Sequence, residues 1–156
     1  MIVRARSRVG ALGRLSFLSV PDLVGAARAQ WYLLRARLSV VLAPRGRLLA
    51  AVRPAEAGRA PSGDAMARAR RVALAVDRAA EYGLFTPTCL VRAIAVERLL
   101  TREGVAGAVV RIGARQGADG PEMHAWIDIG GMVIGDRPEV AGAFTPLHDF
   151  TAVRRA

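Results

Sequence analysis

The segment from Leu90 to Leu100 constrains the fold of this chain more than any other. Between Leu90 and Val96 only Arg92 is polar, and Leu99 and Leu100 follow. On a helix this composition puts apolar side chains nearly all round the axis, and a helix of that kind is buried on most of its sides. The sequence therefore predicts a buried helix around which the rest of the chain is organised.

A helix-start signal, Thr86-Pro87, precedes this segment. Threonine can cap a helix, and proline fits the first helical position, where its missing N–H costs nothing. The predicted helix ends at Gly104 and carries Cys89, the only cysteine of the chain, in its first turn. The positive end of a helix dipole favours the thiolate form of cysteine, which attacks carbonyl groups. Cys89 taken alone nevertheless fits a small buried hydrophobe better, because free cysteine often has that role.

Two more helices are expected before this one. Ser19-Val20-Pro21-Asp22 opens a helix that runs to about Ala43, and a second helix spans Asp64 to Tyr82, with Gly83 as its stop. The expected core stripe of the first is Trp31, Leu34, Leu38 and Val41. The expected inward residues of the second are Met66, Val72, Ala75, Val76 and Ala79. Between the two, Arg45–Arg53 is interpreted as a solvated helix face, with contact to a membrane surface or a partner protein as the alternative, and a linker follows.

After Gly104 the pattern changes to short segments rich in valine and isoleucine, which is typical of strands. The expected strands are Val105–Ala114, Met123–Ile129 and Met132 to Ile134 or Asp136, with a polar loop at Arg115–Pro121, a turn at Gly130-Gly131 and one more short edge segment at Phe144–Leu147. Helices followed by an antiparallel sheet indicate an α+β fold and not a parallel doubly wound one.

Composition bounds the kind of protein. A chain of 156 residues with 53% apolar residues is long enough for one domain with a real core. One cysteine excludes an internal disulfide framework and a cysteine-based zinc site, and two histidines argue against a histidine-rich metal site. We therefore expect neither a metal nor another cofactor.

The net charge of +10 comes entirely from arginine, since all 23 basic residues are arginine. Together with the abundance of alanine, glycine and valine, this indicates codon bias more than selection for a basic surface. An acidic peptide or a nucleic acid remains a conceivable partner, but no arginine cluster is interleaved with aromatic residues, so specific nucleic-acid binding is not expected. The N-terminus lacks a secretory signal and no apolar run is long enough to span a membrane, which predicts a cytoplasmic protein without a transmembrane segment.

A cysteine nucleophile needs a base within hydrogen-bond reach and a third group that orients the base. His124 on the second strand is the candidate base. Asp128 lies four residues along the same strand, about 13 Å away, and so cannot orient it. Asp136, which follows the next strand, is the candidate orienting residue.

The geometry of the hairpin decides whether Asp136 can reach His124. A strict two-residue turn at Gly130-Gly131 would turn Asp136 away. A three-residue connection with a bulge, or a strand that ends at Gly135 and lets Asp136 swing over, would bring the two together. The alternatives are a core histidine and a turn aspartate without catalytic roles, and the second histidine, His148, is interpreted as structural or exposed.

Two segments carry a resemblance to a known family. Met123-His124-Ala125-Trp126-Ile127-Asp128 resembles the His-Ala-Trp strand of transglutaminase-like cysteine hydrolases, within the wider papain-like architecture. Cys89-Leu90-Val91-Arg92-Ala93-Ile94-Ala95, with Leu99-Leu100 and Gly104-Val105 after it, resembles one branch of that group, the split leader peptidases of lasso peptide biosynthesis. The likeness runs from about Arg70 to Phe150, and Trp31 to Leu38 is similar to the helical N-terminal region of that branch.

The resemblance implies a role for each site residue. Cys89 would be the nucleophile, His124 the general base and later acid, and Asp136 the residue that orients His124. The spacing of 12 between His124 and Asp136 suits the family pattern, whereas Met123 stands where a small residue is common. The implied architecture is an N-terminal helical region (1–60) that serves for partner docking, followed by a transglutaminase-like peptidase core (61–156).

The implied function is removal of the leader from a ribosomally made precursor peptide. The implied partners are the precursor itself, a separate leader-recognition protein, and a cyclase that acts afterwards. Two alternatives stay open. The same triad would also serve an acyl transferase or a glutamine deamidase, and an arginine-rich chain without catalysis would serve as a module that binds an acidic peptide or a nucleic acid.

Overall fold

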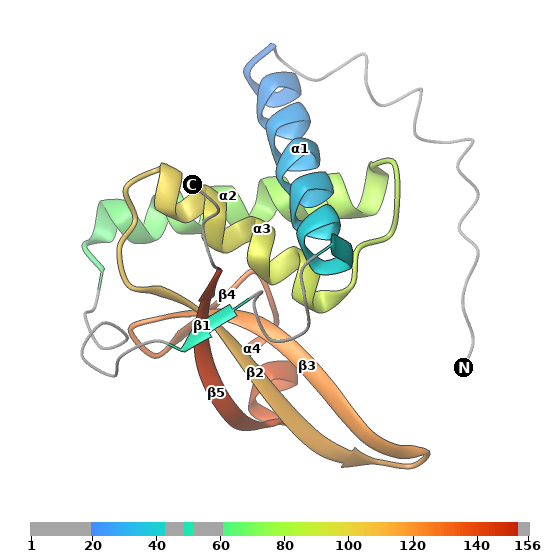
Figure 1. Cartoon of the computed structure of the whole chain (residues 1–156). Coiled ribbons are helices and arrows are strands. Elements are labelled where there is room, and N and C mark those ends of the chain that lie inside the picture. Colours follow the sequence, from blue (N-terminus) through green and yellow to red (C-terminus); the bar gives the residue numbers. More distant parts are fainter. Residues whose placement is uncertain (1–19, 43–48, 52–60, 153–156) are drawn as a thin grey trace.

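The computed structural model describes residues 20–42, 49–51 and 61–152 (Figure 1). Along the chain the elements are α1 (Val20–Leu42), β1 (Leu49–Ala51), α2 (Gly63–Tyr82), α3 (Cys89–Arg102), β2 (Ala108–Gly117), β3 (Gly120–Ile129), β4 (Met132–Ile134), α4 (Pro138–Gly142) and β5 (Thr145–Ala152). The three long helices pack together beside an antiparallel sheet, so the α+β prediction is confirmed. None of the described helices is long and apolar enough to cross a membrane.

Helix α3 is largely buried, as its composition predicts. Eight of its 14 residues are buried. It begins two residues later than predicted, because Thr88 and not Thr86 is the N-cap. The Thr88 hydroxyl accepts a hydrogen bond from the Val91 N–H (3.4 Å), and the Arg92 N–H donates to the Thr88 carbonyl (3.0 Å). Cys89 is consequently the first residue of the helix, at the end where backbone N–H groups have no partner within the helix.

The predicted core stripe of α1 is wrong at three of its four residues, and the fourth, Leu34, is half-buried. Trp31 is 56% exposed and Val41 71% exposed, and Leu38 is exposed as well. The buried residues are Ala29, Leu33 and Ala36. Ala29 and Ala36 are small and let α1 approach its neighbouring helices closely, while Leu33 packs into the core.

Helix α2 agrees with its prediction to within one residue. The Ser62 hydroxyl caps it by accepting from the Ala65 N–H at 3.3 Å, and Gly83 follows its last residue. The buried residues are Met66, Ala69, Ala73, Val76 and Ala79. Of the other two inward residues that were predicted, Val72 and Ala75 are half-buried and pack against the core.

The five strands of the described residues form one sheet in the order β1-β5-β2-β3-β4, with every pair antiparallel. It departs from the prediction in two places. The predicted polar loop at 115–121 is the end of a long β2–β3 hairpin, in which Arg115 and Glu122 lie opposite each other and form an ion pair at 2.6 Å. Such cross-strand pairs stabilise a hairpin whose side chains face solvent. The predicted edge segment at the C-terminus is β5, an internal strand that lies between β1 and β2.

The segment Arg45–Arg53, interpreted above as a helix face, contains strand β1 at residues 49–51. Its other residues lie outside the described part of the chain. Since β1 pairs with β5 and α1 packs on α2 and α3, the described elements before residue 61 contact the same core as the elements after it. The domain division at residue 60 stays a prediction.

The β3–β4 connection is a strict two-residue turn that pairs Ile129 with Met132. Gly130 (φ +58°) and Gly131 (φ +85°) supply the positive angles that such a turn needs. Asp128, only 2% exposed, holds the turn: its carboxylate accepts from the Gly131 N–H at 2.9 Å and from Arg111 at 3.1 Å. The bulged three-residue alternative is therefore wrong.

Candidate active site

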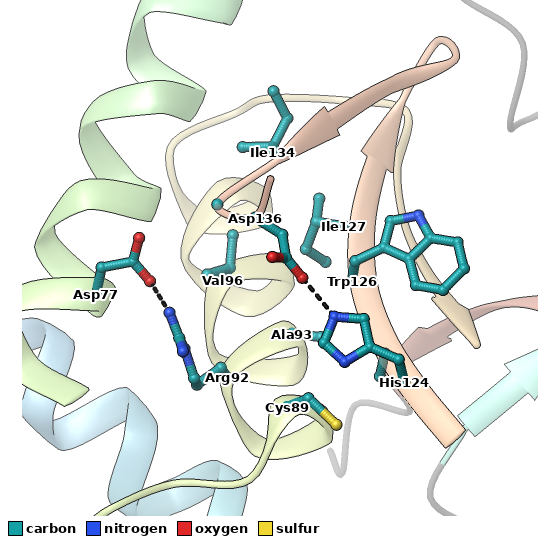
Figure 2. Close-up of a pocket in the computed structure, with 12 residues that line it drawn as sticks. Asp77, Cys89, Arg92, Ala93, Val96, His124, Trp126, Ile127, Ile134 and Asp136 are labelled. Atoms are coloured by element: carbon teal, nitrogen blue, oxygen red, sulfur yellow. Dashed lines mark hydrogen bonds and ion pairs between the residues drawn. The ribbon is translucent and has the colours of Figure 1, made fainter. Parts of the chain in front are cut away.

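Cys89, His124 and Asp136 line one small cavity between α3, β3 and the end of β4 (Figure 2). The cavity encloses about 40 Å³, which is room for only a few water molecules. A larger reactant therefore has to approach these three residues from outside. The sequence predicts this set of residues, and the tertiary structure places all three around the same cavity.

Asp136 reaches His124 because β4 is short. β4 ends at Ile134, opposite Ile127, and Gly135 then adopts a positive φ of 73° that redirects the chain. As a result Asp136 Oδ2 lies 2.5 Å from His124 Nε2, although the two-residue turn alone would have pointed Asp136 away. This is the second of the two geometries that the triad hypothesis requires, a strand that ends at Gly135.

Gly135 has a further reason to be glycine. A Cβ atom at this position would lie 3.1 Å from the Cβ of Ala73 on α2, closer than side chains normally pack. The close approach to α2 and the left-handed backbone thus coincide at the residue that positions Asp136. The second oxygen of the Asp136 carboxylate, Oδ1, accepts a hydrogen bond from the Arg137 N–H at 2.8 Å, and this bond fixes the orientation of the carboxylate.

The His124 ring is held by aromatic neighbours and by Asp136. Its centroid lies 6.0 Å from that of Trp126 and 5.2 Å from that of Phe144. Nε2 faces Asp136, and the other ring nitrogen, Nδ1, is on the side of the ring that faces Cys89 (Figure 2). In a neutral imidazole whose Nε2–H donates to the carboxylate, Nδ1 carries the free lone pair. The arrangement therefore presents a proton acceptor toward the thiol.

The wall of the cavity also contains two charged residues, Asp77 and Arg92, that were not predicted as site residues. Arg92 forms an ion pair with Asp77 of α2, and both side chains are partly exposed. Arg92 lies three residues after Cys89 and hence on nearly the same side of α3. Arg92 is also the one polar residue between Leu90 and Val96, and this isolation is the sequence signal that could have identified it. A partly exposed ion pair contributes little to stability, so its main effect here is to place a guanidinium group beside the candidate nucleophile.

Gly113 of β2 lies opposite His124 in the β2–β3 pair. It makes room for the aromatic rings that surround His124. A Cβ atom on Gly113 would lie 2.8 Å from the Trp126 ring and 2.9 Å from the Phe144 Cβ. Both distances are too short for real contacts, so one of the two rings would have to move. Gly113 is therefore a packing requirement of the candidate site.

We expect Gly113→Ala to lower the free energy of unfolding by about 1–3 kcal/mol through overpacking. Thermal unfolding followed by circular dichroism measures the change. Gly142→Ala is the matched control, because no heavy atom lies within 4 Å of a Cβ built there. A melting temperature that falls no further for Gly113→Ala than for Gly142→Ala would show that the rings yield without cost.

Among the described residues, no group of three or more histidine, cysteine, aspartate or glutamate side chains is placed to hold a metal ion.

The second histidine, His148, lies on β5, opposite Ile112 of β2. The β2–β5 register shifts directly after this pair.

Comparison with known proteins gives one result. The family model described as the transglutaminase-like superfamily matches residues 28–149, which include α2, α3 and the three residues of the cavity. The comparisons with curated proteins and with solved structures gave no match. Since the matched region covers most of the chain and agrees with the observed α+β architecture, the protein belongs to the transglutaminase-like superfamily.

Proposed function

We propose that this protein is a cysteine peptidase that removes the leader from a ribosomally made precursor peptide, as the split leader peptidases of lasso peptide biosynthesis do. The observation that carries the catalytic part is the convergence of Cys89, His124 and Asp136 on one cavity, with 2.5 Å between His124 Nε2 and Asp136 Oδ2. The choice of a precursor peptide as substrate is supported by the resemblance of the Cys89 helix and of the His-Ala-Trp strand to that branch.

The mechanism follows from the positions of the three residues. His124 Nδ1 takes the thiol proton, and the Cys89 sulfur attacks the carbonyl carbon at the leader–core junction. The negative oxygen that forms is stabilised by the Cys89 backbone N–H, which has no partner within the helix at this first position. His124 returns the proton to the departing core amine, and the leader is left as a thioester on Cys89.

Water then completes the reaction. His124, neutral again, accepts a proton from a water molecule that attacks the thioester carbonyl, and the leader is released as a carboxylate while the Cys89 thiol is restored. Asp136 takes no proton in either step. It holds the ring so that Nδ1 faces Cys89, and it stabilises the positive charge of the imidazolium.

The same three residues also suit acyl transfer to an amine or deamidation of glutamine, since membership of the superfamily supports both kinds of chemistry. The products separate these reactions. Hydrolysis gives two peptides cut at one bond, whereas acyl transfer gives an isopeptide and releases ammonia. Deamidation converts a glutamine to glutamate without cutting the chain.

The test is incubation of the wild-type protein with a candidate precursor peptide and its recognition protein, read by mass spectrometry. Two fragments that meet at a single leader–core bond are the expected result. Isopeptide or glutamate products would replace the proposal by the transferase or deamidase. A precursor that is bound but unchanged, with binding that collapses as salt is raised, would identify an arginine-rich binding module.

A docking surface for the recognition protein is the second part of the proposal. The exposed residues Val24, Trp31 and Leu38 follow one another at intervals of seven, so they lie on one face of α1, and exposed Val41 extends that face. Apolar residues at this spacing are typical of a seam that receives a partner element. Because exposed Arg35 adjoins the seam, a partner with acidic residues beside an apolar stripe is the best complement.

We expect the double variant Trp31→Gln, Leu38→Gln to slow cleavage by about tenfold or more when precursor and recognition protein are dilute, because apolar anchors dominate binding energy at interfaces. At saturating precursor without the recognition protein, its rate should equal that of the wild type. Tyr82→Gln, an exposed aromatic residue outside α1, is the control. Equal rates under both conditions would place the docking surface elsewhere.

A further inference from the structure

A second, larger hollow adjoins the candidate active site. It encloses about 490 Å³, within the usual range for ligand pockets, and lies between α2 and the β3–β4 hairpin. The α2 wall consists of Met66, Arg70, Ala73, Leu74 and Asp77, which lie on one face of the helix. The opposite wall runs from Gly131 to Gly135, with Pro138 beyond it. We call this hollow the α2–β4 groove.

The groove adjoins the small cavity that the candidate catalytic residues line. Asp77, Ile134 and Gly135 line both the groove and the small cavity that holds Cys89 and His124. Since the small cavity has no room for a peptide, the chain that is cut must lie outside it, and the groove is a hollow that continues from it. Neither Cys89 nor His124 lines the groove, so a chain lying there has to continue past the end of β4 to reach them.

The walls of the groove are largely apolar. Leu74 is 50% exposed and Met132 41% exposed, and half-buried Val133 lies beside Met132. Exposed apolar side chains that face each other across a groove gain free energy when an apolar ligand covers them. Arg70 is the one basic residue among the residues that line the groove. The chemistry therefore favours a ligand with apolar side chains.

Strand β4 also offers backbone hydrogen bonds to the groove. Among the described strands it is the last in the sheet order, and α2 lies on the side of β4 away from β3 (Figure 2). A two-residue turn makes Ile129 and Met132 a hydrogen-bonded pair, so the next residue, Val133, directs its N–H and C=O away from β3. An extended peptide beside β4 can accept from and donate to that one residue, as in strand addition to a sheet edge.

We propose that the α2–β4 groove binds the substrate peptide in extended form, as an added strand that pairs with Val133. Apolar side chains of the peptide contact Leu74 and Met132, and the bond to be cut lies at the end of the groove beside Cys89. This inference rests on the proposed cysteine chemistry and deepens it, since it assigns the specificity of the site to apolar residues next to the scissile bond.

The test uses the only cysteine of the chain as its reporter. Full-length protein is treated with a short electrophile, acetyl-alanyl chloromethyl ketone, and with two extended ones, acetyl-Leu-Val-Ala chloromethyl ketone and chloroacetyl-Leu-Val-Leu amide. In the extended chloromethyl ketone the peptide precedes the reacting carbon, and in the chloroacetyl peptide it follows that carbon. Intact-mass spectrometry gives the rate of Cys89 alkylation. We expect at least one extended reagent to react with saturation kinetics and about tenfold or more faster than the short reagent.

The groove variants are Leu74→Gln and Met132→Gln, and Leu84→Gln, at an exposed residue that lines neither hollow, is the matched control. Each groove variant should slow the extended reagent by about tenfold, because an apolar contact is lost, while its rate with the short reagent stays within about twofold of the wild type. Leu84→Gln should change neither rate. N-methylation of the single peptide residue that pairs with Val133 should remove most of the advantage, and N-methylation of the residue next to it should not.

Equal effects of the groove variants and Leu84→Gln on the extended reagents would overturn the proposal. So would faster reaction of the groove variants, because it would mean that another segment of this chain fills the groove. Failure of the catalytic proposal has a different signature. In that case His124→Ala would leave the rate of the short reagent unchanged, whatever the groove variants do.

Discussion

Cys89→Ala is expected to abolish cleavage of the precursor peptide, with a loss of at least about 10⁴-fold in rate. The thioester route needs a sulfur atom at the start of α3, and no other cysteine exists in the chain. The fold should survive, because Thr88 caps α3 whichever residue follows it, and replacing a half-buried thiol by a methyl group costs about 1 kcal/mol or less. Mass spectrometry of the precursor measures the first effect and thermal unfolding the second.

The control for Cys89→Ala is the binding of the precursor. The groove and the α1 face are unchanged in this variant, so affinity for the precursor and its recognition protein should be retained within about threefold, since distant sites contribute independently. Cleavage that persists at the wild-type rate in Cys89→Ala would refute the proposed mechanism. Loss of cleavage together with loss of the folded state would be resolved by Cys89→Ser, which keeps the shape of the side chain.

Asp136→Asn is expected to lower the rate of cleavage by about 10²- to 10⁴-fold, the second largest effect. The carboxylate at 2.5 Å from His124 Nε2 fixes which ring nitrogen carries the proton, and it stabilises the imidazolium that forms as the thiolate attacks. An asparagine fills the same space but is neutral and can present its amide N–H to Nε2. The ring then favours the tautomer with the proton on Nδ1, where no lone pair faces Cys89.

Steady-state kinetics measures this loss, which should fall on kcat more than on KM, because Asp136 acts through His124 and does not line the α2–β4 groove. Asp119→Asn is the matched control, since Asp119 is an exposed carboxylate in the turn between β2 and β3. It should leave kcat within about twofold of the wild type, as surface changes of this kind usually do. A kcat for Asp136→Asn equal to that of Asp119→Asn would show that His124 does not depend on Asp136.

Local patterns in the sequence predicted much of the fold. The apolar run after Leu90 predicted a buried helix, and the change to valine- and isoleucine-rich segments after Gly104 predicted the strands, because both signals depend on side-chain periodicity alone. The helix start was displaced by two residues, since Thr86 and Thr88 are both competent caps and only the packed structure selects one.

Contacts between elements were predicted less well. The buried face of α1 carries Ala29, Leu33 and Ala36. Trp31, which is exposed, looked like core because hydropathy does not report which face meets a neighbour. Strand β5 was taken for an edge segment, since its position between β1 and β2 depends on pairing over distances in sequence that no local pattern encodes. The α2–β4 groove was not foreseen for the same reason.

The sequence by itself determined the chemistry that is available: one cysteine at a helix start, one histidine on a strand, and an aspartate twelve residues further on. Only the tertiary structure decided that these groups meet. The two-residue turn would have separated His124 from Asp136, and the short length of β4 together with the positive φ of Gly135 reverses that outcome. A single backbone angle redirects everything that follows it, so the distance between two residues far along the chain is set by folding and not by their spacing.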